Sequence, residues 1–65
     1  MNADVFKGKW NQLKGNVRKQ WGKLTDDDVE QVKGNEEVLL GRLQERYGRT
    51  KEQAREDLNR WLDSM

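Results

Sequence analysis

The carboxylates near the centre of the chain have the spacing that comes nearest to a metal site. Asp26, Asp28 and Glu30 stand at alternate positions, and Glu37 is the twelfth residue counted from Asp26. A calcium-binding loop places its carboxylate ligands at positions one, three, five and twelve. The sixth position, however, is Gln31, where the sharp turn of such a loop requires glycine. We therefore interpret the aspartates as residues that begin a helix, and we expect no metal and no cofactor.

Nucleophilic or general-base chemistry has almost no candidate residues. The 65 residues include no cysteine and no histidine, and Ser64 is the only serine. The usual nucleophile–base pairs and zinc ligand sets therefore have no members. A chain of this length also has difficulty enclosing a ligand cavity of about 300 Å³. We predict that the protein is not an enzyme.

Positive charge is concentrated in the first third of the chain. Residues 1–24 carry six cations and one anion, a net charge of +5, whereas residues 25–65 carry a net charge of −4. A basic amphipathic helix is a candidate for binding nucleic acid or an anionic membrane surface. The candidate polyanion-binding residues are Lys7, Lys14, Arg18, Lys19 and Lys23. Because a helical wheel divides these cations between two sides of the helix, a dispersed and solvated set is the competing interpretation.

The aromatic residues allow two interpretations. Three tryptophans and Tyr47 could serve as platforms on which nucleic acid bases stack. Their spacing favours core packing instead, since Trp10 and Trp21 fall on the apolar face of the first helix and Trp61 shares the face of Leu58. We predict a shared interior that shields the indoles.

The first half of the chain predicts one long helix and one short helix. Proline is absent, so capping residues and glycines set the helix boundaries. Apolar residues recur at steps of three and four over residues 3–21, which predicts a helix that Gly22 ends. Thr25 is the predicted N-cap of a second, short helix, which ends at Lys33 and Gly34.

The second half of the chain predicts two further helices. Asn35 is the predicted N-cap of a helix that Gly48 ends. Thr50 and Gln53 have the spacing of a capping box at the start of the last helix. The predicted inward faces are formed by Leu39, Leu40, Leu43 and Tyr47 in the third helix and by Ala54, Leu58, Trp61 and Leu62 in the fourth.

A nine-residue pattern occurs twice along the chain. Residues 15–23 and 41–49 both read G-x-(V/L)-x-x-x-(W/Y)-G-(K/R), at an offset of 26 residues. Such an internal repeat, together with short connections, favours two similar hairpins that pack together. We predict an all-α fold, a small compact array of four short helices built from two similar helix-turn-helix hairpins.

Two glycines stand inside the predicted helices, where glycine costs about 1 kcal/mol relative to alanine. Gly15 and Gly41 both project away from their apolar stripes, so packing in the core does not explain them. One hypothesis is that they leave bare backbone for close contact with another helix, a partner or a second copy. The competing interpretation is tolerated weakness in a marginally stable chain.

Two longer motifs resemble those of a known protein family. Residues 21–28 read WGKLTDDD and residues 44–48 read QERYG, alongside Trp10, Lys14-Gly15, Gly34 and Gly41. With these motifs the chain resembles the CsbD-like family, in its YjbJ type, over nearly its whole length. The resemblance implies a small all-α protein that bacteria make abundantly under general stress, with no established activity and no catalytic residues to carry over.

Composition supports a single small domain over residues 1–65. The longest apolar run, residues 38–40, is far shorter than a membrane span, and nothing at the N-terminus has the form of a signal peptide, so we expect a cytoplasmic protein. The leading hypothesis is a non-enzymatic stress protein that acts as a protectant or as a small interaction module. The alternative is binding of nucleic acid or of an anionic surface. The sequence names no protein partner and sets no oligomeric state.

Overall fold

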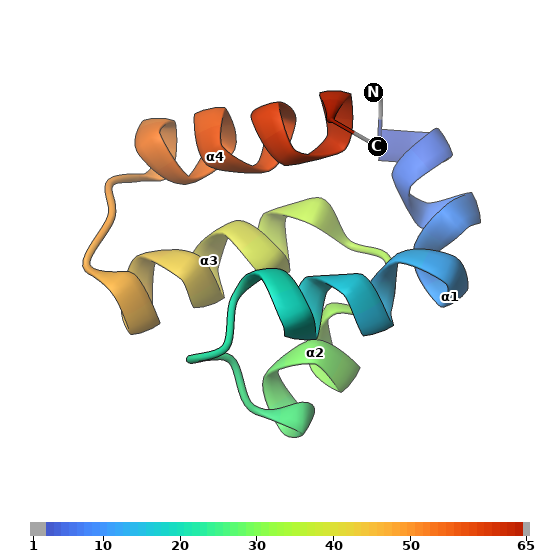
Figure 1. Ribbon diagram of the computed structural model, residues 1–65, viewed down its shortest axis with the longest axis horizontal. Coiled ribbons are helices and arrows are strands. Elements are labelled where there is room, and N and C mark those ends of the chain that lie inside the picture. Colours follow the sequence, from blue (N-terminus) through green and yellow to red (C-terminus); the bar gives the residue numbers. More distant parts are fainter. Residues whose placement is uncertain (1–2, 65) are drawn as a thin grey trace.

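The chain folds into four α-helices joined by short connections, as the computed structural model shows for residues 3–64 (Figure 1). The helices are α1 (Ala3–Gln20), α2 (Asp26–Val32), α3 (Glu36–Tyr47) and α4 (Lys51–Asp63). The described residues contain no strand. The predicted all-α fold of four short helices is therefore confirmed.

Side-chain caps begin three of the helices, as predicted. Thr25 caps α2 in a capping box that Asp28 completes, and Thr50 caps α4 in a capping box that Gln53 completes. The side chain of Asn35 accepts a hydrogen bond from the backbone N–H of Glu37 at the start of α3. Each cap satisfies a backbone N–H group that would otherwise lack a partner within the helix.

The helix ends differ in detail from the sequence prediction. α1 ends at Gln20, before Trp21, and Gly22 does not adopt the left-handed conformation of a helix-ending glycine. At the end of α2 the left-handed residue is Lys33, with a φ of 49°, and Gly34 follows with a φ of 79°. Gly48 ends α3 as predicted, in the left-handed conformation, with its N–H donating to the carbonyl of Gln44.

Most of the interior is made by the apolar stripes that the spacing predicted, and Leu24, Val29 and Val32 join it without having been predicted. Buried side chains come from all four helices and from the connection after α1: Phe6, Trp10, Leu13, Val17, Trp21, Leu24, Val29, Val32, Leu39, Leu40, Leu43, Ala54, Leu58 and Leu62. Burial of Trp10 and Trp21 confirms the core interpretation for these two indoles. Trp61 and Tyr47 are partly buried and pack against this core, so the predicted packing of Trp61 is confirmed, although its indole is shielded less completely than the other two. Trp61 packs edge-on against Trp21, with ring centroids 5.1 Å apart.

Helix α3 lies at the centre of the arrangement (Figure 1). Among the described helices it is the one whose backbone approaches all three others, whereas the backbone of α4 approaches α3 alone. The pairs α1–α2 and α3–α4 are compatible with the two predicted hairpins. None of the helices in residues 3–64 has the length and apolar character needed to cross a bilayer.

Candidate functional site

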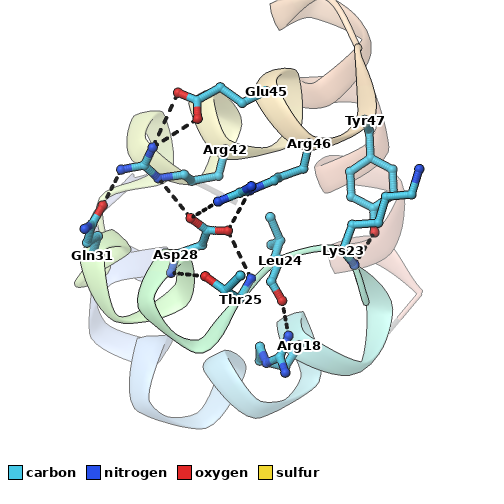
Figure 2. A network of polar contacts seen from close by, with 10 residues as sticks. All are labelled: Arg18, Lys23, Leu24, Thr25, Asp28, Gln31, Arg42, Glu45, Arg46 and Tyr47. Carbon is cyan, nitrogen blue, oxygen red and sulfur yellow. Dashed lines mark hydrogen bonds and ion pairs between the residues drawn. The ribbon is translucent and has the colours of Figure 1, made fainter.

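The most extensive polar network of the described residues is centred on Asp28, in the first turn of α2 (Figure 2). Its side chain is 7% exposed and receives a two-pronged contact from Arg46 of α3. Arg46 Nε lies 2.9 Å from Asp28 Oδ2, and Nη2 lies 3.2 Å from Oδ1. Arg42, one turn earlier in α3, places its Nε 3.7 Å from Oδ1. This bidentate geometry is the strong form of the arginine–carboxylate contact.

The same carboxylate also holds the start of α2. Asp28 Oδ2 accepts the backbone N–H of Thr25 at 3.0 Å, and Asp28 donates its own N–H to the Thr25 hydroxyl oxygen at 3.0 Å. The hydrogen bond from Arg46, followed by the one from Thr25, lowers the pKa of Asp28 to about 2, against the opposing effect of burial. A carboxylate that stays ionised and has its oxygens engaged has no general-acid role at neutral pH. Because Asp28 of α2 is bound by Arg46 of α3, the network instead has a structural role, which is to join these two helices.

Sequence reasoning assigned Asp28 to helix capping and missed its ion pair. The overlooked ion pair joins two residues that are 18 positions apart, and a local sequence motif cannot show such a contact. One signal was present, because Asp28 stands four residues before Val32 and thus on the buried face of α2. A carboxylate on a buried face requires a cation, and Arg42 and Arg46 follow at helical spacing.

The predicted polyanion-binding residues do not form one surface. Arg18 pairs with Asp26 at 2.9 Å and donates to the carbonyl of Leu24. Lys23 covers the ring of Tyr47, with its ammonium 5.2 Å from the ring centroid, and donates its backbone N–H to the Tyr47 hydroxyl at 3.1 Å (Figure 2). Lys19 is exposed and has no ion pair within the described part of the chain.

Two of the predicted cations do come together, around a hollow between α1 and α2. Lys7 and Lys14 line this hollow of about 360 Å³, and they are joined there by Lys33 from the end of α2. The remaining lining residues are Trp10, Asn11 and Glu30. Lys33 was not among the predicted binding residues, because its sequence position indicated only the end of a helix. Its place beside α1 depends on tertiary packing.

The two glycines of the contact hypothesis face open space. A methyl group built at Gly15 or Gly41 would meet no atom within 4 Å, apart from the local backbone of its own helix. Contact with another helix of this chain therefore does not explain either glycine in the described structure. The close approach occurs at Gly34, where an added Cβ would lie 3.1 Å from both Cα and Cγ of Lys7. Contact of Gly15 and Gly41 with a partner or a second copy stays a prediction.

A second hollow, of about 750 Å³, lies where the start of α1, the α2–α3 connection and α4 face one another. Its charged lining is balanced, since Asp4, Glu36 and Glu37 stand against Lys7, Lys33 and Arg55. Arg55 is held by Glu37 at 3.1 Å, and Lys51 lies 2.7 Å from the same carboxylate. These contacts lower the pKa of Glu37, first through the hydrogen bond from Lys51. The balanced lining gives no preference for a ligand of either charge.

The calcium-like spacing does not assemble a calcium site in the described residues. Asp26 pairs with Arg18, Asp28 pairs with Arg46, and Glu37 belongs to the network of Lys51 and Arg55. No group of three or more potential metal ligands occurs within residues 3–64. The interpretation of Asp28 as a capping residue is confirmed by its bonds to Thr25.

The fold is that of a small all-α protein in which four helices enclose an apolar core and ion pairs link neighbouring helices. Within this class, the chain belongs to the CsbD-like family, whose model matches residues 4–56. It is 49% identical over 65 residues to the UPF0337 protein PA4738 of Pseudomonas aeruginosa, with both chains covered completely. It is also 49% identical over 61 residues to the UPF0337 protein YjbJ of Escherichia coli K12, covering 94% of this chain and 88% of the relative. No solved structure matches the chain.

Proposed function

We propose that this protein is a non-enzymatic cytoplasmic stress protein that protects other macromolecules when it is present at high concentration. The observation that supports the proposal is that apolar side chains lie in the interior while charged and amide side chains form the surface. Among the described residues Val5 is the only large hydrophobic side chain classed as exposed, at 40%, while charged and amide side chains cover most of the surface. A protectant of this kind needs solubility and bound water, and it needs no pocket.

The charge pattern allows many copies of the protein to be present together without strong electrostatic repulsion between them. The chain has 25 charged residues but a net charge of only +1, and its mean hydropathy is −1.26. Charges of both signs keep the surface hydrated, while the small net charge limits long-range repulsion between copies. Copies can therefore accumulate between labile proteins and separate their exposed apolar surfaces.

The non-enzymatic part of the proposal is supported by the residue inventory. Cysteine and histidine are absent from the sequence. The buried carboxylate of Asp28 is occupied by Arg46 and Thr25, so it is not free for catalysis. The resemblance to general stress proteins of the CsbD-like family supports expression under stress.

The test measures how much activity a labile enzyme keeps through drying or heating. We expect the protein at excess to preserve more activity than an equal mass of an inert globular protein. A charge-depleted control replaces exposed residues that have no described ion pair, in the variant K9Q/K19Q/E52Q/E56Q, which keeps the net charge. Protection should fall in this variant while the helix content stays unchanged. Equal protection by the inert protein refutes the proposal.

The two other hypotheses remain predictions. An interaction module that uses the backbone at Gly15 and Gly41 predicts that the double alanine variant loses association in sedimentation, with no loss of stability. Binding of nucleic acid through α1 predicts affinity that falls steeply with salt. That hypothesis requires the basic residues to act together, whereas Arg18 is occupied by Asp26 and Lys23 by Tyr47.

A further inference from the structure

Arginine and lysine behave differently in this structure. All six arginines lie within 4.0 Å of a carboxylate: Arg18, Arg42, Arg46, Arg49, Arg55 and Arg60. Of the seven lysines, Lys51 alone has such a partner within residues 3–64. All the arginines are therefore ion-paired, whereas six lysine ammonium groups have no carboxylate within 4.0 Å among the described residues.

Three of these six lysines gather around the hollow of about 360 Å³ between α1 and α2. Lys7 and Lys14 are seven residues apart on α1, nearly two full turns, so they stand on the same side of the helix. Lys33 joins them from the C-terminal end of α2. With Glu30 as the one carboxylate in the lining, the hollow has a net charge of +2.

Backbone packing sets the relative positions of Lys7, on α1, and Lys33, at the end of α2. Gly34 is buried and lies so close to α1 that an added Cβ would be 3.1 Å from the Cα of Lys7. Lys33, the adjacent residue, adopts a left-handed conformation that is unusual for a residue with a side chain. The packing of the α2–α3 connection on α1 thus brings Lys33 to Lys7, although the two residues are 26 positions apart in the sequence.

We propose that this hollow binds a compact oligophosphate, meaning two or three linked phosphate groups such as pyrophosphate or the tail of a nucleotide. Lysine ammonium groups are compact point charges that bind phosphate oxygens from several directions. Like charges gathered without partners repel one another, and a multivalent anion removes this repulsion on binding. The amide of Asn11 adds a neutral hydrogen-bond donor to the same lining.

The size and the lining of the hollow favour a compact anion over a nucleic acid strand. Its volume of about 360 Å³ is at the small end of ligand sites, enough for a few linked phosphates. Trp10 is 7% exposed, so it presents too little ring surface for base stacking. The neighbouring cations that a longer strand would need, Arg18 and Lys23, are engaged elsewhere.

The test is calorimetric titration of the full chain with pyrophosphate, tripolyphosphate, a nucleoside diphosphate and orthophosphate at low salt. We expect the three oligophosphates to bind and orthophosphate to bind much more weakly. Similar affinity for pyrophosphate and the nucleoside diphosphate shows that the linked phosphates are recognised, and much tighter binding of the nucleotide shows that the base is recognised instead. Backbone amide shifts in nuclear magnetic resonance spectra should change at Lys33, Gly34 and the Lys7 turn.

Two matched variants separate a local site from general charge. K7Q/K14Q and K9Q/K19Q each remove two lysines from α1, so they have the same net charge. We expect K7Q/K14Q to weaken pyrophosphate binding roughly tenfold or more, and K9Q/K19Q to weaken it by less than about threefold. K33Q should weaken binding like K7Q/K14Q, and E30Q should strengthen it. Equal losses in the two double variants, no heat of binding, or tighter binding of a single-stranded oligonucleotide that depends on Lys9 and Lys19 would overturn the proposal.

Discussion

Replacing Asp28 with asparagine tests whether the buried ion pair joins α2 to α3. The substitution keeps the size of the side chain and an oxygen that can accept the Thr25 N–H, but it removes the charge that faces Arg46. A pKa that falls from 3.8 to about 2 corresponds to about 2 kcal/mol of stabilisation in the ionised form. Because Arg46 is 44% exposed, solvent screening reduces the expected loss to roughly 1–2 kcal/mol.

The assay is thermal unfolding followed by circular dichroism at neutral pH. For a chain of this length, a loss of roughly 1–2 kcal/mol lowers Tm by about 5–10 °C. Asp27 provides the matched control, since it also lies in the first turn of α2 but is exposed and has no ion pair among the described residues. D27N removes the same charge from the same helix end and should change Tm much less.

The pH dependence provides a second readout of the same pair. Because folding lowers the pKa of Asp28 below its value in the unfolded chain, the stabilisation is fully present above about pH 4 and is lost as the pH falls towards 2. The unfolding free energy of D28N should therefore decline less steeply than that of the wild type over this interval. The assigned role of the pair would be refuted if D28N and D27N lost the same Tm and if the unfolding free energy of D28N fell with pH as steeply as that of the wild type.

Four further substitutions have outcomes that follow from local geometry. T50A removes the hydroxyl that caps α4 and should cost about 1 kcal/mol of unfolding free energy, measured by urea titration. G15A should stabilise by up to about 1 kcal/mol because its methyl group enters open space, whereas G34A should destabilise because of its φ of 79° and the contact with Lys7. Iodide should quench Trp61 more than the two buried indoles, so W61F should lose most of the quenchable fluorescence.

For three of these expectations, the result that would contradict the reasoning is as follows. A stable T50A variant would mean that another group satisfies the N–H of Gln53. Stabilisation by G34A would mean that the α2–α3 connection moves away from α1 at little cost. Equal quenching of all three indoles would reopen the interpretation of the tryptophans as a recognition surface.

Features set by local chemistry were predictable from the sequence. The caps at Thr25, Asn35 and Thr50 depend on one side chain and the backbone two or three residues later, and all three are present. The buried stripe of α1 follows from its 3.6-residue periodicity. These features need no knowledge of the tertiary fold.

Features that depend on packing between elements were missed. The pairing of Asp28 with Arg46 and the meeting of Lys33 with Lys7 both join distant parts of the chain. The partial exposure of Trp61 reflects its position at the edge of the core, which the helical period does not specify. Helix α1 ends at Gln20, one residue before the predicted end at Trp21, although the N–H of Trp21 still donates to the carbonyl of Val17.

The attachment of α4 has a consequence for how the molecule opens. Its backbone approaches only α3 among the described helices, so 13 residues depend mainly on one interface, aided by the edge contact of Trp61 with Trp21. A fluctuation that breaks this interface releases the C-terminal helix while the Asp28–Arg46 link still holds α2 to α3. Amide protons of α4 should then exchange with solvent through a partial opening of lower free energy than global unfolding.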